Sequence, residues 1–370
     1  MKEYIVQPGD TLQSIARMFD VPTGRLLSIN PELEETGTLY VGQILQVPEN
    51  GQVRRMIEVN AYSFPIYDPL QWSSVFPFLT YLSIFGHEIR PGGALILPDS
   101  EPLILAARQA DVAPLMVVTN TVDGVYSGEL LHGIFSDKQA QLTLIERSVE
   151  VAQEYGYFGV NFGFEYVLQE DYEAYASFLH LAANRLHSAG LIILASIRLV
   201  VVLNNQTAPL TEHLQLYNHI LDRLIITPGD FVCLEGLTPI DVVQQGLDFV
   251  VQYISGPKIL LGAPNCCYEW QAPYRPGQEY QVLSPNQADA IVRSAGVFPG
   301  TDPYTQMAVF EIGEDGTQRV ILCNSQNSLL VLELVTTYNV GGISLRTLQL
   351  FNFASYQDIA IQYNIRKVLS

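Results

Sequence analysis

The chain has 370 residues, and about 150 residues for a typical domain predicts close to two domains. Hydrophobic residues make up 48% of the chain, alongside 27 Gly and 21 Pro. This composition excludes a disordered or fibrous protein and predicts a large buried core. The 38 acidic residues outnumber the 19 basic ones and give a net charge of −19. Phosphate backbones and anionic membrane surfaces repel such a chain, so we expect no nucleic-acid partner.

Segments for export or membrane insertion are not expected. The first eight residues lack the apolar core of a secretory signal, which predicts synthesis in the cytoplasm without a signal peptide. The longest apolar stretch runs from Leu191 to Leu203, contains Ser196 and Arg198, and is too short to span a bilayer. We therefore expect a buried strand there and no membrane insertion.

The cysteines follow neither the spacing of a zinc ribbon nor that of a disulfide framework. They are Cys233, Cys266, Cys267 and Cys323. We expect the adjacent Cys266 and Cys267 to be reduced thiols, because disulfides are rare in proteins made in the cytosol. The sequence also lacks a Gly-rich phosphate loop and a metal-ligand spacing, so we expect no metal and no cofactor.

Residues 1–48 are expected to form a small α+β module with the order strand, helix, helix, strand. Residues 4–6 read as a short strand. Asp10 can cap the first helix, with Gln13 three residues later as in a capping box. A second short helix ends near Asn30, and residues 42–48 form the closing strand.

This module resembles a LysM domain. The resemblance rests on Tyr4-x-Val6-x-x-Gly9-Asp10-Thr11-Leu12, then Asn30-Pro31, then a closing Gly-Gln-x-Leu-x-Val-Pro at 42–48. LysM domains bind polymers that contain N-acetylglucosamine, mainly peptidoglycan and chitin. The resemblance implies a shallow sugar groove between two loops, formed by Gly9, Asp10, Thr11, Leu12, Ile29, Asn30 and Pro31. A helix cap at Asp10 and a turn at Asn30-Pro31 are the purely structural roles of these residues, and they are compatible with sugar binding.

From residue 52 on, short β-rich runs alternate with helical stretches, which predicts a second domain over 52–370. The candidate strands are Met56–Ala61, Tyr81–Phe85, Pro114–Thr119, Gly159–Phe164, Leu191–Ile197, Leu224–Thr227, Lys258–Ala263 and Gly342–Leu345. Eight strands that alternate with helices predict an α/β fold, a (β/α)8 TIM barrel. Residues 264–340 are too many for one crossover, and strands over 308–312 and 318–323 flank a hairpin turn, so we expect a small α+β insertion there.

The most informative run lies at the predicted fourth strand of the barrel. Alternation along the strand directs Val160, Phe162 and Phe164 toward the helices, and it directs Asn161, Gly163 and Glu165 into the barrel. Active sites of such barrels lie at the C-terminal ends of the strands. A carboxylate that projects into the barrel at this end is therefore a candidate for chemistry.

The sequence around Glu165 resembles glycoside hydrolase family 18, and most of all its branch from endospore-forming bacteria, in which LysM modules precede a barrel that trims the spore cortex. Runs at 80–85, 112–120, 258–264 and 341–344 carry the same resemblance. In the family, strand four carries Asp-x-x-Asp-x-Asp-x-Glu. The final Glu protonates the leaving oxygen while the acetamido group of the substrate attacks the anomeric carbon. The resemblance implies that Glu165 is this acid.

Three cooperating positions depart from the family pattern. Gly163 stands where the family has the Asp that orients the acetamido group. At the end of strand six, the family's Tyr-Asp aligns with Gly229-Asp230, and at the end of strand eight Leu345 stands near the place of a Trp that forms the floor of the sugar site. Loss of one preorganised group of this kind costs about 10²–10³ in rate.

Further sugar contacts are expected around the barrel mouth. The resemblance implies them for Tyr62 at the end of strand one, for Asn161 and for Asp230. Tyr268 and Trp270, just past strand seven, are aromatic candidates for the cleft. Core packing is the alternative interpretation of Tyr62, and a polar group satisfied by a neighbour is the alternative interpretation of Glu165.

Three functions remain open from the sequence. One is a retaining β-N-acetylglucosaminidase that acts on peptidoglycan, with Glu165 as the acid. Another is a binding protein whose barrel recognises cortex or chitin-like glycan but cuts it poorly or not at all. The third is a structural component of the spore layers, and the resemblance implies spore association for all of them. A carboxylate beside Gly163 would favour the enzyme, and an apolar neighbour would favour the other two.

Overall fold

The computed structural model describes residues 2–19, 21, 23–30, 33, 39–47, 54–65, 72–198, 208–227, 240–263, 267–271, 280–298, 300–301, 308–313, 319–323, 327–345, 347–348 and 353–369. At the N-terminus, β1 (Lys2–Ile5) pairs antiparallel with β2 (Ile44–Val47). Between them lie α1 (Leu12–Met18) and α2 (Thr23–Ser28). The predicted order of strand, helix, helix, strand is confirmed.

The cap of α1 lies one residue later than predicted. Thr11 is the N-cap residue, and its side chain and that of Ser14 form the capping box. The predicted cap, Asp10, instead accepts hydrogen bonds from the Tyr4 hydroxyl and the Gln7 amide. Asp10 and Thr11 are both residue types that cap helices well, so the sequence alone does not decide which of the two is the N-cap.

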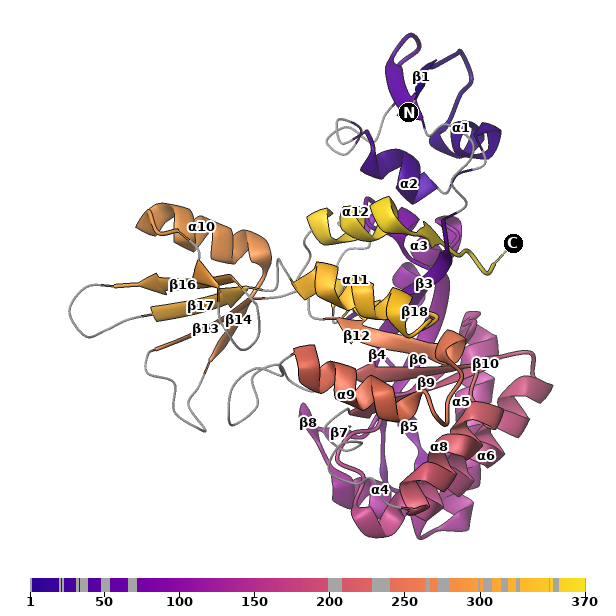
Figure 1. Ribbon diagram of the computed structural model, residues 1–370. Helices are drawn as coiled ribbons and strands as arrows, with labels where there is room; N and C mark the ends of the chain where they lie inside the picture. The colour runs from indigo at the N-terminus through magenta and orange to yellow at the C-terminus, as the bar shows by residue number, and fades with distance from the viewer. Residues whose placement is uncertain are drawn as a thin grey trace.

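Eight parallel strands close into a barrel (Figure 1). They are β3 (Met56–Ser63), β4 (Tyr81–Ile89), β6 (Ala113–Thr119), β9 (Gly159–Phe162), β10 (Ile192–Arg198), β11 (Arg223–Thr227), β12 (Ile259–Ala263) and β18 (Gly342–Leu345). The barrel closes because β3 pairs with β18 on one side and with β4 on the other. All eight predicted strands are present, and the predicted fold class is confirmed.

Helices cover the outer face of the barrel (Figure 1). They are α3 (Glu101–Gln109), α4 (Gly128–Phe135), α5 (Lys138–Tyr155), α6 (Tyr172–Ser188), α8 (Ala208–Ile220), α9 (Ile240–Val250), α11 (Asn327–Thr337) and α12 (Phe353–Gln362). Shorter elements are β5 (Leu95–Ile96), β7 (Thr121–Val122), β8 (Val125–Tyr126), β19 (Asn364–Ile365), and the 3-10 turns η3 (Phe76–Phe78), η4 (Pro91–Gly93), η5 (Gln169–Asp171) and η6 (Gly256–Lys258). None of the described helices is long and apolar enough to cross a bilayer.

The N-terminal end of the barrel is filled by side chains, so any open site must lie at the other end. Inward-facing Tyr81, Leu115 and Leu194 form a buried cluster, against which Val368 and Leu369 of the C-terminal tail pack. The next tail residue inward, Lys367, donates hydrogen bonds to the carbonyl oxygens of Phe76 and Leu79. The C-terminal tail therefore closes this end of the barrel.

A separate five-stranded sheet follows β12 along the chain. Its strands are β13 (Cys267–Gln271), β14 (Gln281–Leu283), β15 (Gly300–Thr301), β16 (Ala308–Ile312) and β17 (Arg319–Cys323), and α10 (Pro285–Ala295) packs on it. The expected α+β segment is thus present, and Ser284 caps α10 with Gln287 in a capping box, as such a Ser-Pro-x-Gln run favours. Cys267 is disulfide-bonded, so the reduced thiol expected there is wrong. Its partner in the register of β13 and β17 is Cys323, and strand register of this kind cannot be read from sequence spacing.

Candidate functional site

The backbone at the end of β9 is fixed by one buried side chain, Asn120. Asn120 follows β6, accepts a hydrogen bond from the Glu165 amide at 3.0 Å, and donates to the Glu165 carbonyl at 2.8 Å. It also donates to the Ser127 carbonyl at 2.9 Å. Two neighbouring loops are thereby tied together at the height of Glu165. The sequence analysis did not select Asn120, although an Asn directly after a barrel strand is a usable signal.

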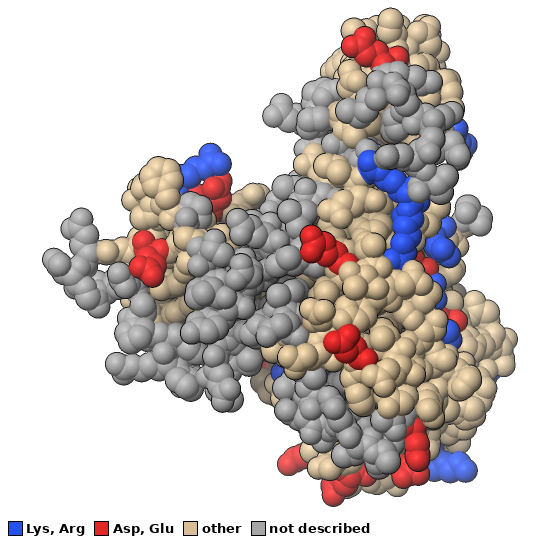
Figure 2. All heavy atoms as spheres, viewed as in Figure 1, with Lys and Arg blue, Asp and Glu red and all other residues tan. Residues whose placement is uncertain are grey.

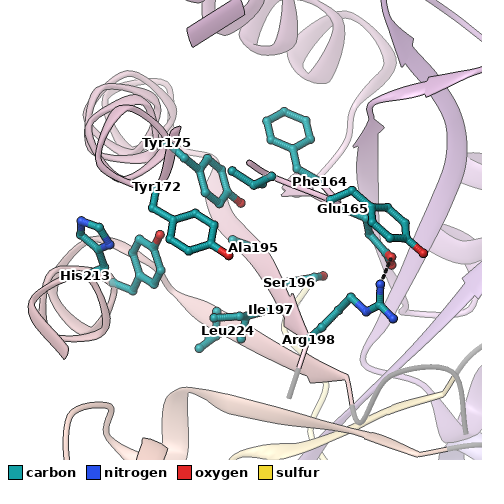
Figure 3. A pocket seen from close by; sticks show the side chains of 13 residues that line it. Phe164, Glu165, Tyr172, Tyr175, Ala195, Ser196, Ile197, Arg198, His213 and Leu224 are labelled. Carbon is teal, nitrogen blue, oxygen red and sulfur yellow. Dashed lines mark ion pairs between the residues drawn. The ribbon is translucent and has the colours of Figure 1, made fainter. Parts of the chain in front are cut away.

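The Glu165 side chain lies at the barrel mouth beside a cation. It is 34% exposed, and its Oε2 lies 3.8 Å from Nη1 of Arg198 at the end of β10 (Figure 3). The Arg198 guanidinium also lies 5.1 Å from the centre of the Tyr166 ring. The Glu165 carboxyl group and the Arg198 guanidinium thus form a long ion pair at the mouth.

The space beside Gly163 is bordered by a hydrophobic side chain. A Cβ atom at Gly163 would meet Cγ1 of Val117 at 3.2 Å and the Val118 carbonyl at 3.8 Å. Val117 comes from the neighbouring strand β6 and is fully buried. Among the described residues, the nearest neighbours of this position are therefore an apolar side chain and backbone, the arrangement that the sequence analysis expects for a binding protein or a structural component.

Below Glu165, Tyr62 and Asn161 meet inside the barrel. Asn161 Nδ2 donates to the Tyr62 hydroxyl at 3.1 Å, and burial raises the pKa of Tyr62. Asn161 Oδ1 is buried and has no hydrogen-bond partner in the described part of the chain. A buried acceptor of this kind is costly unless a donor reaches it. An N–H or O–H group of a ligand would satisfy it.

An aromatic column borders the same mouth. The Tyr62 ring stacks on Phe85 with centroids 4.9 Å apart, and Phe85 stacks on Phe64 at the same distance. Phe64 is 42% exposed. Flat apolar faces at a barrel rim suit the apolar faces of sugar rings. Sequence reasoning selected Tyr62 and missed Phe64 and Phe85.

The other predicted barrel contacts, Tyr268 and Trp270, belong to β13 of the small sheet. Tyr268 in β13 is fully buried and packs edge-on against Tyr280, and Trp270 of the same strand is half-buried. Burial gives Tyr268 a packing role in the small sheet, and its sugar contact stays a prediction. Asp230 lies outside the described residues.

In the N-terminal module, two of the predicted groove residues hold the fold together. Asp10 accepts hydrogen bonds from the Tyr4 hydroxyl and the Gln7 amide. Both bonds lower the pKa of the Asp10 carboxyl group, and the bond from Tyr4 has the larger effect. Asn30 is buried, donates to the carbonyls of Leu26 and Gln46, and accepts from the Gln46 amide at 2.7 Å.

Only some of the predicted groove residues lie on the surface of this module. Gly9 and Thr11 are exposed, and Leu12 and Ile29 are half-buried. Pro31 lies outside the described residues. Part of the Gly9–Leu12 loop is therefore open to solvent, whereas Asn30 lies beneath the surface.

Known proteins resemble both the N-terminal module and the barrel of this chain. The model of the LysM domain family matches residues 4–48. The cortical fragment-lytic enzyme of Bacillus subtilis is 26% identical over 99% of this chain and 99% of its own length. The crystal structure of the Bacillus cereus spore cortex-lytic enzyme SleL superposes with a TM-score of 0.78 and 27% identity, over 99% of this chain and 87% of that one. A family 18 chitinase from Cycas revoluta, at 15% identity, a TM-score of 0.70, and coverage of 82% of this chain and 98% of its own, shares the fold.

The mouth of the barrel thus combines the Glu165 carboxylate, the aromatic column and the Asn161 amide oxygen, which is unpaired among the described residues. The barrel that carries them is common to these proteins. Residues 4–48 are a LysM domain, and the chain that follows folds as a (β/α)8 barrel similar to the spore cortex-lytic enzymes and to the family 18 chitinases.

Proposed function

We propose that this protein binds N-acetylglucosamine-containing peptidoglycan of the spore cortex, and that its barrel recognises the glycan without cleaving it. The observation that carries this proposal is the surroundings of Glu165. Its charged neighbour is the Arg198 guanidinium, and the neighbour of Gly163 is Val117.

The chemistry of the family explains why these neighbours matter. A general acid must deliver its proton to the leaving oxygen, and the Glu165 carboxyl group is instead engaged by the Arg198 guanidinium 3.8 Å away. The substrate-assisted route also needs a group that orients the acetamido oxygen and stabilises the charge that develops on its carbon. At Gly163 no side chain can do this, and Val117 is apolar. Both elements of the reaction are thus weakened together.

Binding does not require either element. The partly exposed Gly9–Leu12 loop, the aromatic column and the buried acceptor of Asn161 can contact a neutral glycan without proton transfer. The names of the relatives, a cortical fragment-lytic enzyme and a spore cortex-lytic enzyme, support cortex peptidoglycan as the polymer and the spore as the location.

A slow hydrolase is the second candidate function. It is supported by the position of Glu165 at the end of β9 and by similarity over the full length of a lytic enzyme. In that case Glu165 donates the proton to the leaving oxygen, and Tyr62 and Asn161 hold the sugar.

Binding can be tested by isothermal titration of the full chain with N-acetylglucosamine oligomers and by sedimentation with insoluble cortex peptidoglycan. We expect association that changes little between low and high salt, since a neutral ligand releases few counterions. Thr11→Trp, which crowds the exposed loop, should weaken binding, and Tyr155→Phe on the far surface of α5 is the matched control. No association with either glycan would refute the proposal.

A further inference from the structure

A cavity of about 230 Å³ lies beside the barrel mouth, between two helices and the strands that they cover. The helices α6 and α8 form one side of it, and β10 and β11 form the other (Figure 3). Phe164, Ala195 and Leu224 of its wall belong to the core between strands and helices. The cavity therefore lies outside the strand barrel, and the partly exposed Glu165 and Arg198 line its edge at the mouth.

The aromatic side chains of this cavity are uncharged near neutral pH. They are Tyr172 and Tyr175 from α6, His213 and Tyr217 from α8, and Phe164. Burial raises the pKa of Tyr175 and of Tyr217, and burial lowers the pKa of His213. The interior thus offers aromatic faces and phenol hydroxyl groups, and the charged groups of the lining are those at its edge.

One hydroxyl group in this interior indicates a ligand with a ring and a polar substituent. Tyr175 projects from α6 into the cavity and is 7% exposed (Figure 3). Its hydroxyl forms no hydrogen bond with any residue that the structure describes. A buried donor without an acceptor costs stability, which a bound acceptor would recover. The ring of a phenol can pack on the tyrosine rings, and its hydroxyl can accept from Tyr175 and donate to a neighbouring phenol oxygen.

The edge of the cavity carries one group of each charge. Glu165 Oε2 and Arg198 Nη1 lie 3.8 Å apart, which is longer than the roughly 3.2 Å limit of an N–H···O hydrogen bond. A ligand group with a single charge is attracted by one of these side chains and repelled by the other, whereas a zwitterion meets both with the opposite sign. The ammonium and the carboxylate of an α-amino acid are attached to one carbon, so they can contact two neighbouring side chains at once.

We propose that this cavity binds a free aromatic α-amino acid with a hydroxyl group on its ring. The ammonium group contacts Glu165, the carboxylate contacts Arg198, and the ring lies among the tyrosines of α6 and α8. This site is separate from the proposed function, because the cavity lies outside the strand barrel and a neutral glycan needs neither charge. Glycan binding can therefore fail with this site intact, and this site can fail with glycan binding intact.

The test is a ligand-observed NMR titration of the full chain with three probes at physiological salt. The probes are L-tyrosine, L-tyrosinamide, which lacks the carboxylate, and N-acetyl-L-tyrosine, which lacks the ammonium group. We expect L-tyrosine to bind and each derivative to bind at least tenfold more weakly, because each loses one charged hydrogen bond. Absence of L-tyrosine binding, or equal affinity for all three probes, would overturn the proposal.

Two variants assign the two charges of the ligand. In Arg198→Gln, L-tyrosine should bind no better than L-tyrosinamide, and in Glu165→Gln it should bind no better than N-acetyl-L-tyrosine. Arg293→Gln is the matched control, because this arginine of α10 also pairs with a carboxylate, that of Asp289 at 2.7 Å, and lies on the small sheet. A preference for L-tyrosine over L-tyrosinamide that persists in Arg198→Gln would show that the carboxylate binds elsewhere and would contradict the assignment.

A third variant places the ring of the ligand in this cavity. The unchanged protein should bind L-tyrosine roughly threefold to tenfold more tightly than L-phenylalanine, because one more hydrogen bond forms with Tyr175. Tyr175→Phe should remove this preference, while its melting temperature without ligand holds or rises. Tyr155→Phe, at the exposed end of α5, should keep the preference. Equal affinity for the two amino acids in the unchanged protein, or a preference that survives in Tyr175→Phe, would overturn the placement of the ring.

Discussion

At the residue scale, the Val117 side chain lies directly beside Gly163 at the end of β9. The 3.2 Å approach of a Cβ at Gly163 to Val117 Cγ1 is tighter than an ordinary contact. Gly163→Asp should therefore lower the free energy of unfolding by about 1–3 kcal/mol, through crowding and through burial of a carboxylate. Urea unfolding of the full chain measures this.

The Val117→Ala variant provides the matched partner for a double-mutant cycle. Alone it should also destabilise, because it leaves a cavity. The combined Val117→Ala and Gly163→Asp variant should lose less stability than the sum of the two single changes, because the Ala makes room for the new carboxylate. Strictly additive losses would mean that Val117 does not occupy the space beside Gly163.

The same residues show what the sequence could and could not predict about the site. Glu165 was found from strand alternation, because the side-chain period of a strand is fixed. Its pairing with Arg198 was not found, because it depends on register. Phe162 lies opposite Ala195, so the positions three residues later, Glu165 and Arg198, reach the same height. Register between two strands separated by a helix is set by packing and is not visible in local pattern.

At the scale of single elements, Asn30 joins α2 to β2 in the LysM domain. Asn30→Ala should destabilise that domain by about 2–4 kcal/mol, because the Leu26 carbonyl and the carbonyl and amide of Gln46, all buried or partly buried, lose their partner. Hydrogen exchange of peptides from residues 2–47 should accelerate, while peptides of the barrel keep their protection. Loss of glycan binding with unchanged exchange would show instead that Asn30 contacts the sugar directly.

The strand β4 carries a buried histidine that should make the barrel acid-sensitive. His87 follows an irregularity in the pairing of β4 with β6, and its Nε2 lies 3.0 Å from the Tyr157 hydroxyl, which donates to Ser100. Burial lowers the pKa of His87 from 6.5 to about 4. Between these values the unfolded chain binds a proton that the folded chain does not, so stability falls as the pH drops from 6.5 to 4. The shift corresponds to about 3 kcal/mol.

This dependence is measured by urea unfolding at several pH values. His87→Gln should flatten the fall between pH 6.5 and pH 4 relative to the unchanged protein. His180→Gln, at an exposed position of α6, should leave the fall as it is. Parallel curves for His87→Gln and the unchanged protein would contradict the account of His87.

Element ends were predictable to different degrees. The capping box of α10 at Ser284 is strong because a Pro follows the cap and Gln287 stands three residues on. At α5, Asp137 caps the helix through the Gln139 amide, and the adjacent Ser136 is a residue type that could cap as well. Two adjacent residues that can both cap leave a one-residue ambiguity, and α1 shows the same ambiguity between Asp10 and Thr11.

At the scale of the whole molecule, one end of the barrel is closed and the other carries the site. The tail after β19 fills the N-terminal end, and α2 of the LysM domain packs on α12 (Figure 1). Acidic side chains are spread over the LysM domain, the small sheet and the barrel (Figure 2). A neutral polymer can approach such a surface, whereas a polyanion is repelled.

The overall architecture was largely predictable, and its closing contacts were not. Period-two and helical patterns locate eight strands and the helices between them, so the barrel follows from counting. Three features depend on segments that are distant in sequence and meet only in the folded chain. They are the closure of the barrel by the C-terminal tail, the disulfide at Cys267 and the cavity around Tyr175. No local pattern in the sequence reports such meetings.

The most direct test of the central claim is a time course of the full chain with chitohexaose and with cortex fragments, read by mass spectrometry beside Glu165→Gln. The Gln side chain cannot donate the proton, so the variant sets the level of no acid catalysis. We expect intact oligomers to remain in both samples, with product formation in the unchanged protein no faster than in Glu165→Gln. Rapid cleavage by the unchanged protein that disappears in Glu165→Gln would contradict the claim and identify an active glycosidase.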